Sequence, residues 1–148
     1  MKELTVLKSQ ITAELEKLRM LLDEANAIAK KKGANIDIRA GGSILHDFYC
    51  GAENIFHAIA TAIDESVPAG LSWHIELLNQ MTLNIGNIRS AVITKETART
   101  FEEYLRFRHL FRKRYGFELE WAGIKRLLKH LPSAYKALKK DIASLFEG

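Results

Sequence analysis

Apolar residues recur every three or four positions along most of the chain, the spacing that gives an α-helix one apolar face. The first stripe of this kind runs through residues 4–28, and Gly33, which follows three lysines, favours its end. A second stripe covers residues 43–65 and is followed by a predicted turn at residues 68–70. No stretch alternates apolar and polar residues for long enough to predict a β-strand.

Two further helices are predicted in the middle of the chain. Ser72 can cap a short third helix, and the glycine and asparagine residues within 83–93 favour a loop after it. Thr94 can cap a fourth helix that reaches about Tyr115, where Gly116 favours its end.

A fifth helix is predicted to start near Trp121, where apolar residues again follow the helical spacing. Pro132 falls within this stretch and is expected either to kink the helix or to start a new segment at Ala134. No internal repeat and no low-complexity linker divides the chain, so residues 1–148 are expected to form one domain. The pattern predicts an all-α bundle of long helices with short connections.

Charge and cysteine content narrow the setting in which the protein is expected to work. The formal net charge of the 148 residues is +4, which permits a nucleic-acid partner without requiring one. The single cysteine, Cys50, cannot form an internal disulfide, which favours a reducing compartment. No apolar run suits a signal peptide or a membrane span, so a cytoplasmic protein without a membrane partner is expected.

One segment, YLRFRHLFRKRYG at residues 104–116, carries five cations and a histidine among four aromatic rings. On a helical wheel, three aromatic side chains form a stripe expected to face the core: Tyr104, Phe107 and Phe111. The edge of that stripe is formed by Arg108, Arg112 and Tyr115. Further round lies a second polar cluster of Arg106, His109 and Lys113. Arg114 falls on the buried side, where it is expected to snorkel or to form an ion pair.

These residue types suit the cleavage of RNA without a metal ion. The planar arginine fork binds phosphate oxygens, and a histidine beside it can move a proton near neutral pH. A ribonuclease of this kind needs a base for the 2′-hydroxyl, an acid for the leaving oxygen and a cation for the charged phosphorane. The alternative interpretation is a solvated cationic helix face that carries an inert histidine.

Three segments together resemble HepT-like proteins, which belong to the HEPN superfamily of helical proteins. The segments are LHDFYCGAENIFHAIA at residues 45–60, PAGLSWHIELLNQM at 68–81 and YLRFRHLFRKRYGFELEW at 104–121. The third is the most specific, and the resemblance covers effectively the whole chain. It implies a HEPN-like up-and-down bundle of four to five helices that forms dimers, with two copies of the motif helix facing each other across a cleft.

The resemblance also implies a function and a set of partners. HepT proteins are toxins of type VII toxin–antitoxin pairs and metal-independent endoribonucleases, so no cofactor and no metal is expected. Their partner is a minimal nucleotidyltransferase called MntA, which transfers AMP to a tyrosine of the toxin and so silences it. The expected partners are an MntA-like antitoxin, an RNA such as tRNA or mRNA, and further copies of the chain in a homodimer or higher oligomer.

The family motif is an arginine, four to six residues, and then a histidine, with a tyrosine two residues after that histidine. Carried over, the arginine is Arg108 and the AMP-accepting tyrosine is Tyr115, whereas the histidine position holds Lys113. A lysine can hold a phosphate or stabilise a phosphorane, but it is a poor substitute for histidine in moving protons. His109 is the candidate substitute proton carrier. The candidate residues for binding RNA phosphates are Arg106 and Arg112.

Two alternatives to a ribonuclease toxin remain open. The first is a catalytically degenerate HEPN protein that binds a nucleotidyltransferase partner or RNA without cleaving anything, and Lys113 favours it. The second is a helical interaction module with no nucleic-acid role. The sequence FRHLFRKRYGFEL as a whole favours the toxin.

Two acidic residues and one histidine outside the motif helix have mainly structural interpretations. His74, next to Trp73, is expected to anchor the third helix. Asp47 and Glu53 are expected to form ion pairs at the surface. In this superfamily an acidic residue on a neighbouring helix can orient the motif arginine, but the sequence does not assign that role to either of them.

Three further features carry weaker signals. Cys50 is expected to be buried and unreactive. His46 and His57 are too far apart in sequence for a ligand pair on one helix, so no metal site is predicted. The basic run within residues 125–140 is expected to be a solvated face, or to extend an RNA-binding groove if it borders the cleft.

Overall fold

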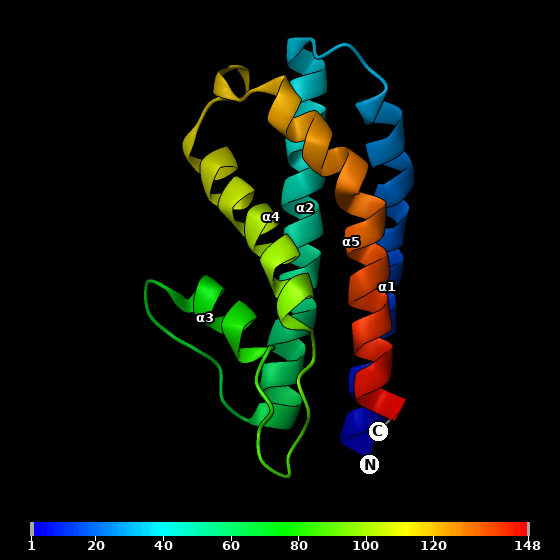
Figure 1. Cartoon of the computed structure of the whole chain (residues 1–148), viewed down its shortest axis with the longest axis vertical. Coiled ribbons are helices and arrows are strands. Elements are labelled where there is room, and N and C mark those ends of the chain that lie inside the picture. The colour runs from blue at the N-terminus through cyan, green and yellow to red at the C-terminus, as the bar shows by residue number, and fades with distance from the viewer. Residues whose placement is uncertain (1, 148) are drawn as a thin grey trace.

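The computed structural model describes residues 2–147, apart from the side chains of Glu3 and Phe117. Those residues form five α-helices and no β-strand (Figure 1). The helices are α1 (Lys2–Ala29), α2 (Asn35–Ile59), α3 (Trp73–Gln80), α4 (Lys95–Lys113) and α5 (Trp121–Glu147). A π-helical turn, Ala60–Asp64, continues α2, and a 3-10 turn, Gly116–Glu118, precedes α5.

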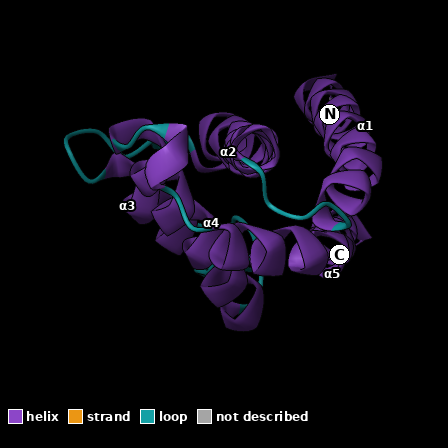
Figure 2. Ribbon diagram, turned by 90° about the horizontal axis from the view of Figure 1, so that it is seen from above, coloured by secondary structure: helices purple, strands orange, loops and turns teal. Residues whose placement is uncertain are grey.

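The four long helices run alternately up and down the long axis, and the two chain ends lie at the same end of the bundle (Figure 1). Helix α2 lies in the middle and contacts each of the other four. Seen from above, α1 lies on one side of α2, and α3 and α4 lie on the other (Figure 2). The predicted all-α bundle of four to five helices is therefore confirmed.

The core forms around α2, whose apolar stripe includes the fully buried side chains Phe48, Ile55 and Phe56. Phe48 packs against two rings of α4, with centroid distances of 5.6 Å to Phe101 and 5.3 Å to Tyr104. Burying each such ring contributes roughly 1.5–3 kcal/mol. These contacts fix α4, and with it the motif, against the central helix.

The N-terminus of α2 lies earlier than the sequence predicted, at Asn35 instead of about residue 43. The Asp37 carboxylate accepts hydrogen bonds from the backbone N–H groups of Gly33 and Ala34, at 3.2 and 3.0 Å. This carboxylate stabilises the first helical turn, so the helix does not need a continuous apolar stripe there. Gly33 has a φ of +89° and supplies the turn that leads into it.

The fourth helix begins as predicted but ends two residues early. Thr94 caps it by accepting a hydrogen bond from the backbone N–H of Thr97, at 3.0 Å. The last helical residue is Lys113, and Arg114 has an extended backbone. Arg114 is exposed, so its predicted position on the buried side is wrong, because that prediction continued the helical wheel past the end of the helix.

The proline in the last helix does not interrupt it. Helix α5 continues through Pro132 from Trp121 to Glu147, so no new segment starts at Ala134. Apolar side chains on both sides of the proline are buried against the rest of the bundle, including Leu128, Leu131 and Leu138. This packing offsets the cost of a proline within a helix.

The loop after α3 is confirmed, and one buried ion pair holds it in place. The Arg89 guanidinium contacts the Asp64 carboxylate through two nitrogens, with NH2 2.7 Å from Oδ2. The same guanidinium donates to the carbonyl oxygens of Leu83 at 2.8 Å and Gln80 at 3.1 Å. The Gln80 amide donates to Asp64 at 2.8 Å. We call Asp64, Gln80 and Arg89 the clamp, because they join the end of α2, the end of α3 and the loop.

Candidate functional site

Arg108 is the most buried cation of the motif helix, with 8% of its surface exposed. It lies on the side of α4 that faces α3, and its NH1 is 3.3 Å from Nδ1 of His74. Its Nε is buried and has no hydrogen-bond partner within the described residues. The wheel predicted that Arg108 lies at the edge of the apolar stripe beside Arg112. In the structure it belongs to the buried face, and Arg112 is exposed.

His74 joins Arg108 to a carboxylate on the central helix. Its Nδ1 lies 2.8 Å from Oε2 of Glu53, and both side chains are largely buried, 15% and 9% exposed. The imidazole also packs against the indole of Trp73, with ring centroids 3.7 Å apart and the ring planes tilted by 31°. Three helices therefore meet at one set of polar side chains, the Glu53–His74–Arg108 cluster.

This cluster corrects one prediction and extends another. Glu53 is not a surface ion-pair residue, because it is buried and its carboxylate contacts an imidazole that in turn contacts the motif arginine. His74 does more than anchor α3, because its ring lies between Glu53 and Arg108. Asp47, by contrast, is exposed and lies 3.6 Å from His46, as expected of a surface pair.

A tyrosine next to the cluster contributes a second unpaired polar atom. The hydroxyl of Tyr49 is buried without a hydrogen-bond partner among residues 2–147. Burial and the neighbouring Glu53 raise the pKa of Tyr49, while Arg108 acts in the opposite direction. The phenol therefore stays neutral, and it adds no charge beside the Glu53 carboxylate and the Arg108 guanidinium.

His109 lies on the exposed side of the cluster. Its ring is edge-on to that of His74, with centroids 6.0 Å apart. Partial burial lowers the pKa of His109, and the neighbouring His74, Lys113, Arg108 and Arg112 lower it further. The imidazole of His109 is therefore surrounded by cations of the motif segment.

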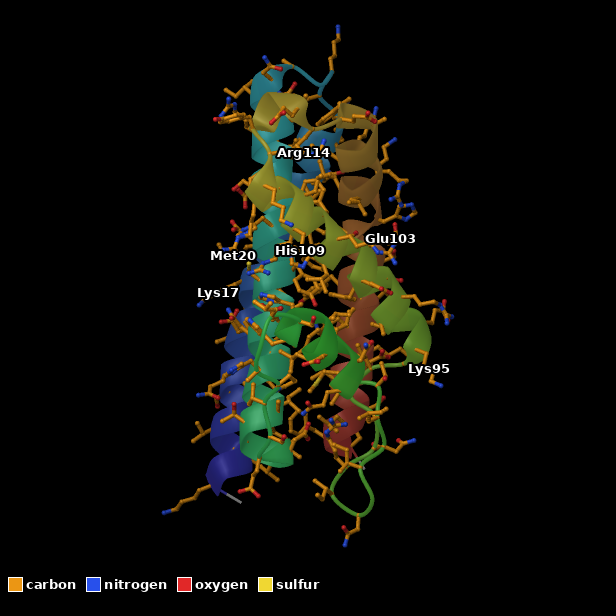
Figure 3. All side chains as sticks on the ribbon, turned by 90° about the vertical axis from the view of Figure 1, so that its left-hand side faces the viewer. Lys17, Met20, Lys95, Glu103, His109 and Arg114 are labelled. Atoms are coloured by element: carbon orange, nitrogen blue, oxygen red, sulfur yellow. The ribbon has the colours of Figure 1, made fainter. Side chains whose placement is uncertain are left out.

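The other residues of the motif segment are exposed around the end of α4. Arg106 lies 3.3 Å from Glu102, one helical turn away, whereas Arg112 and Lys113 are in the last turn of the helix. Tyr115 is 71% exposed and follows the helix. It does not lie on one helical edge with Arg108 and Arg112 as predicted, because the backbone leaves the helix after Lys113. Figure 3 views the face that carries α3 and α4, with His109 on the upper half of α4 and Arg114 just beyond its end.

The basic run on α5 is a solvated face. Its cations are exposed or half-buried, and Arg126 pairs with Glu103 of α4 at 2.9 Å. Cys50 is half-buried, not buried as predicted, and its sulfur lies 3.8 Å from the ring nitrogens of His46. Neither feature joins the Glu53–His74–Arg108 cluster.

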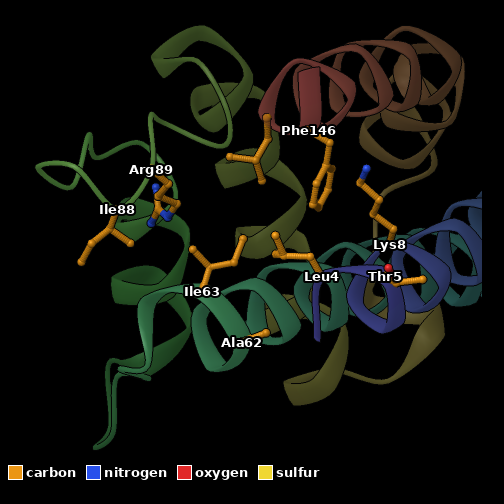
Figure 4. Close-up of a pocket in the computed structure, with 9 residues that line it drawn as sticks. Leu4, Thr5, Lys8, Ala62, Ile63, Ile88, Arg89 and Phe146 are labelled. Carbon is orange, nitrogen blue, oxygen red and sulfur yellow. The ribbon is translucent and has the colours of Figure 1, made fainter. Parts of the chain in front are cut away.

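A cavity of about 590 Å³ lies apart from the motif, between the start of α1, the end of α5 and the clamp (Figure 4). Its lining combines apolar side chains with two cations, and it includes Leu4, Lys8, Ile63, Arg89 and Phe146. Across residues 2–147 no group of three or more His, Cys, Asp or Glu side chains is placed to hold a metal ion. Every helix in that range is too short or too polar to span a membrane.

The described residues form an all-α, HEPN-like bundle, and Arg108 lies on its fourth helix. A family model described as HepT-like protein matches residues 40–148, which is more than half of the chain and includes the whole cluster. The chain belongs to the HepT-like protein family. This membership indicates a toxin of the HEPN type. Comparison with curated proteins and with solved structures found no match.

Proposed function

We propose that the protein is the toxin of a toxin–antitoxin pair and cleaves RNA as a metal-independent endoribonuclease. The strongest support in this HepT-like chain is the burial of Arg108 beside His74, whose imidazole contacts Glu53. Other cations of the motif segment lie at the surface around it. Packing fixes a buried guanidinium in position before substrate arrives, which favours recognition of a phosphate. The whole chain is proposed to act as one domain in the cytoplasm.

The RNA backbone is proposed to lie along the outer side of α4. Arg106, Arg112 and Lys113 are exposed there and supply positive charge close to Arg108. Contacts of this kind bind phosphates of any sequence and weaken as the salt concentration rises. By the family resemblance, a second copy of the chain is proposed to face this helix, so that two clusters line one cleft.

Tyr115 is the proposed acceptor of AMP. It lies just beyond α4, its backbone N–H donates to Oε1 of Glu118 at 2.8 Å, and its side chain is well exposed. The phenolic oxygen would attack the α-phosphorus of ATP, pyrophosphate would leave, and a base of the partner nucleotidyltransferase would take the phenolic proton. The bulk and charge of AMP beside Arg112 and Lys113 would then block RNA from this face.

The test of the ribonuclease is cleavage of a labelled RNA in EDTA by wild type and by Arg108→Ala. We expect cleavage by wild type and a loss of about 100-fold or more in the variant, because removal of a single group that stabilises charge in the transition state has that effect. Arg99→Ala is the matched control, because Arg99 is an exposed arginine on the same helix, away from the motif. Equal rates for Arg108→Ala and wild type would refute the proposal.

A second candidate function is a HEPN protein that binds RNA or the nucleotidyltransferase without cleaving RNA. The observation that favours it is Lys113 at the position of the family histidine. Lys113→His separates the two functions. If wild type is inactive and Lys113→His cleaves RNA, the chain is a degenerate toxin whose site is otherwise intact.

The regulatory proposal has its own assay. Incubation with the partner nucleotidyltransferase and ATP is expected to add the mass of AMP to a peptide containing Tyr115, and Tyr115→Phe is expected to remain unmodified. Modification of Tyr115→Phe to the same extent at another residue would contradict this assignment.

A further inference from the structure

We propose that His74, oriented by Glu53, is the base that takes the 2′-hydroxyl proton during RNA cleavage. This inference rests on the proposed ribonuclease function and assigns its proton carrier to a residue outside the motif helix. Lys113 leaves the motif without its histidine, so a ribonuclease at this site needs a proton carrier from another element. Helix α3 supplies an imidazole beside the motif arginine.

The contacts of His74 determine which ring nitrogen carries the proton. A carboxylate can only accept, so the 2.8 Å approach of Glu53 Oε2 requires a hydrogen on Nδ1. The guanidinium of Arg108 also has no acceptor, so its 3.3 Å approach to the same Nδ1 is a close contact and not a hydrogen bond to it. In the neutral ring, Nε2 therefore holds the lone pair and is the atom that accepts a proton.

The side chains of the cluster are all largely buried. The Glu53 side chain is 9% exposed and the His74 side chain 15%, so both are largely buried and the imidazole is slightly more accessible. Within the described residues, Nε2 makes no hydrogen bond, whereas Nδ1 donates to Glu53. A carboxylate behind one nitrogen fixes the ring and stabilises the imidazolium that forms when the other nitrogen takes a proton.

The charged and titratable groups around the His74 ring come from two helices. Glu53 and, beyond it, Tyr49 belong to α2, while Arg108 and His109 belong to α4. Arg108 is close enough to hold a phosphate oxygen while His74 acts on the adjacent ribose. His109 lacks the corresponding arrangement, because no carboxylate contacts it within residues 2–147 and cations surround it.

The proposed step is a transfer of the phosphodiester within the RNA. Nε2 of His74 takes the proton of the 2′-hydroxyl, a bond forms between the 2′-oxygen and phosphorus, and the bond from phosphorus to the 5′-oxygen breaks. The leaving 5′-oxygen takes a proton from water, and the imidazolium returns its proton to the hydroxide formed. The products are a 2′,3′-cyclic phosphate and a 5′-hydroxyl, and Arg108 stabilises the negative charge on the phosphorane.

The experiment measures single-turnover cleavage of one RNA against pH for wild type, His74→Gln, His109→Gln and Glu53→Gln. We expect His74→Gln to lose about 100-fold or more in rate and to lose the rise of the rate with pH near neutrality. His109→Gln is expected to keep that rise and to lose less than about tenfold in rate. His57→Gln, an exposed histidine on α2 away from the cluster, is the matched control for the substitution.

Glu53→Gln keeps the proposal testable if His74→Gln does not fold, which circular dichroism would reveal. Loss of the carboxylate charge removes a group that stabilises the imidazolium, so the rise of the rate should move to lower pH. A rise at unchanged pH in Glu53→Gln, or a His74→Gln enzyme within threefold of wild type, overturns the role of His74. Wild type that does not cleave RNA at all overturns the proposed function itself, and the assignment of the base falls with it.

Discussion

Replacing Arg89 with methionine is expected to destabilise the fold by about 3 kcal/mol, although Arg89 is not part of the candidate site. The side chains of Arg89 and Asp64 are each 2% exposed, so removing the guanidinium leaves a carboxylate in the interior without its counter-charge. Breaking a buried ion pair in this way costs about 3–5 kcal/mol. The Gln80 amide still donates to Asp64 at 2.8 Å, which favours the lower end of that range.

Urea unfolding followed by circular dichroism measures this loss directly. For a chain of this size, about 3 kcal/mol corresponds to a fall of roughly 6–12 °C in melting temperature. Arg99→Met is the matched control, because Arg99 is exposed and its replacement should change the free energy of unfolding by less than about 0.5 kcal/mol. Asp64→Leu combined with Arg89→Met should recover part of the loss, because no charge is then left buried.

The same variant connects stability to the candidate site. Gln80 ends α3, and His74 lies one residue after its start, so the clamp holds the far end of the helix that presents the imidazole. Hydrogen exchange in residues 80–93 should therefore rise in Arg89→Met. A loss below about 1 kcal/mol, with unchanged exchange in these residues, would refute the claim that a desolvated ion pair holds this loop.

Three further predictions concern single side chains of α2 and α4. Tyr49→Phe should leave the free energy of unfolding unchanged or raise it by up to about 1 kcal/mol, because the buried hydroxyl has no partner in the described residues. Tyr104→Phe, its matched counterpart, should lower that free energy by about 1 kcal/mol, because this hydroxyl donates to the Leu127 carbonyl at 2.9 Å; urea titrations that rank the two variants in the opposite order would contradict this reasoning. Burial and the neighbouring cations lower the pKa of His109, so below the ordinary histidine value of 6.5 the unfolded chain takes up a proton first and the folded state loses stability. His109→Gln should therefore narrow the difference in melting temperature between pH 8 and pH 5. An unchanged difference would contradict the claim that the pKa of His109 is lowered in the folded protein. Lys113→His, in an active wild type, should raise the cleavage rate by less than about tenfold if His74 already acts as the base, and a larger rise would indicate that the motif position had lacked its proton carrier.

The helices could be predicted from the sequence because the spacing of apolar residues is a local signal. The capping residue Thr94, which marks the start of α4, is another local signal. It missed the first turns of α2 because a carboxylate, Asp37, stabilises them in place of an apolar stripe. The predicted end of α4 is two residues too late, because the glycine signal at Gly116 lies beyond Arg114, where the backbone already becomes extended. Boundaries depend on such single contacts, and periodicity alone does not determine them.

The candidate site was only half visible in the sequence. Arg108 was identified from its motif, but the burial of its side chain depends on how α4 packs against α2 and α3. Glu53 and His74 precede Arg108 by more than thirty residues and lie 21 residues apart. Nothing in their local sequence links them to the arginine, because only the packing of three helices brings these side chains together. The Trp-His pair after Ser72 was the one local signal, and it also suits an ordinary helix anchor.

The most direct test of the proposed ribonuclease activity is to incubate the purified protein in EDTA with an RNA and with a DNA of the same sequence. The ends of the products are then identified. We expect that RNA alone is cut, that the products carry 2′,3′-cyclic phosphate and 5′-hydroxyl ends, and that Arg108→Ala is slower by about 100-fold or more. Intact RNA after incubation with wild type, or cleavage by Arg108→Ala at the wild-type rate, would contradict this expectation.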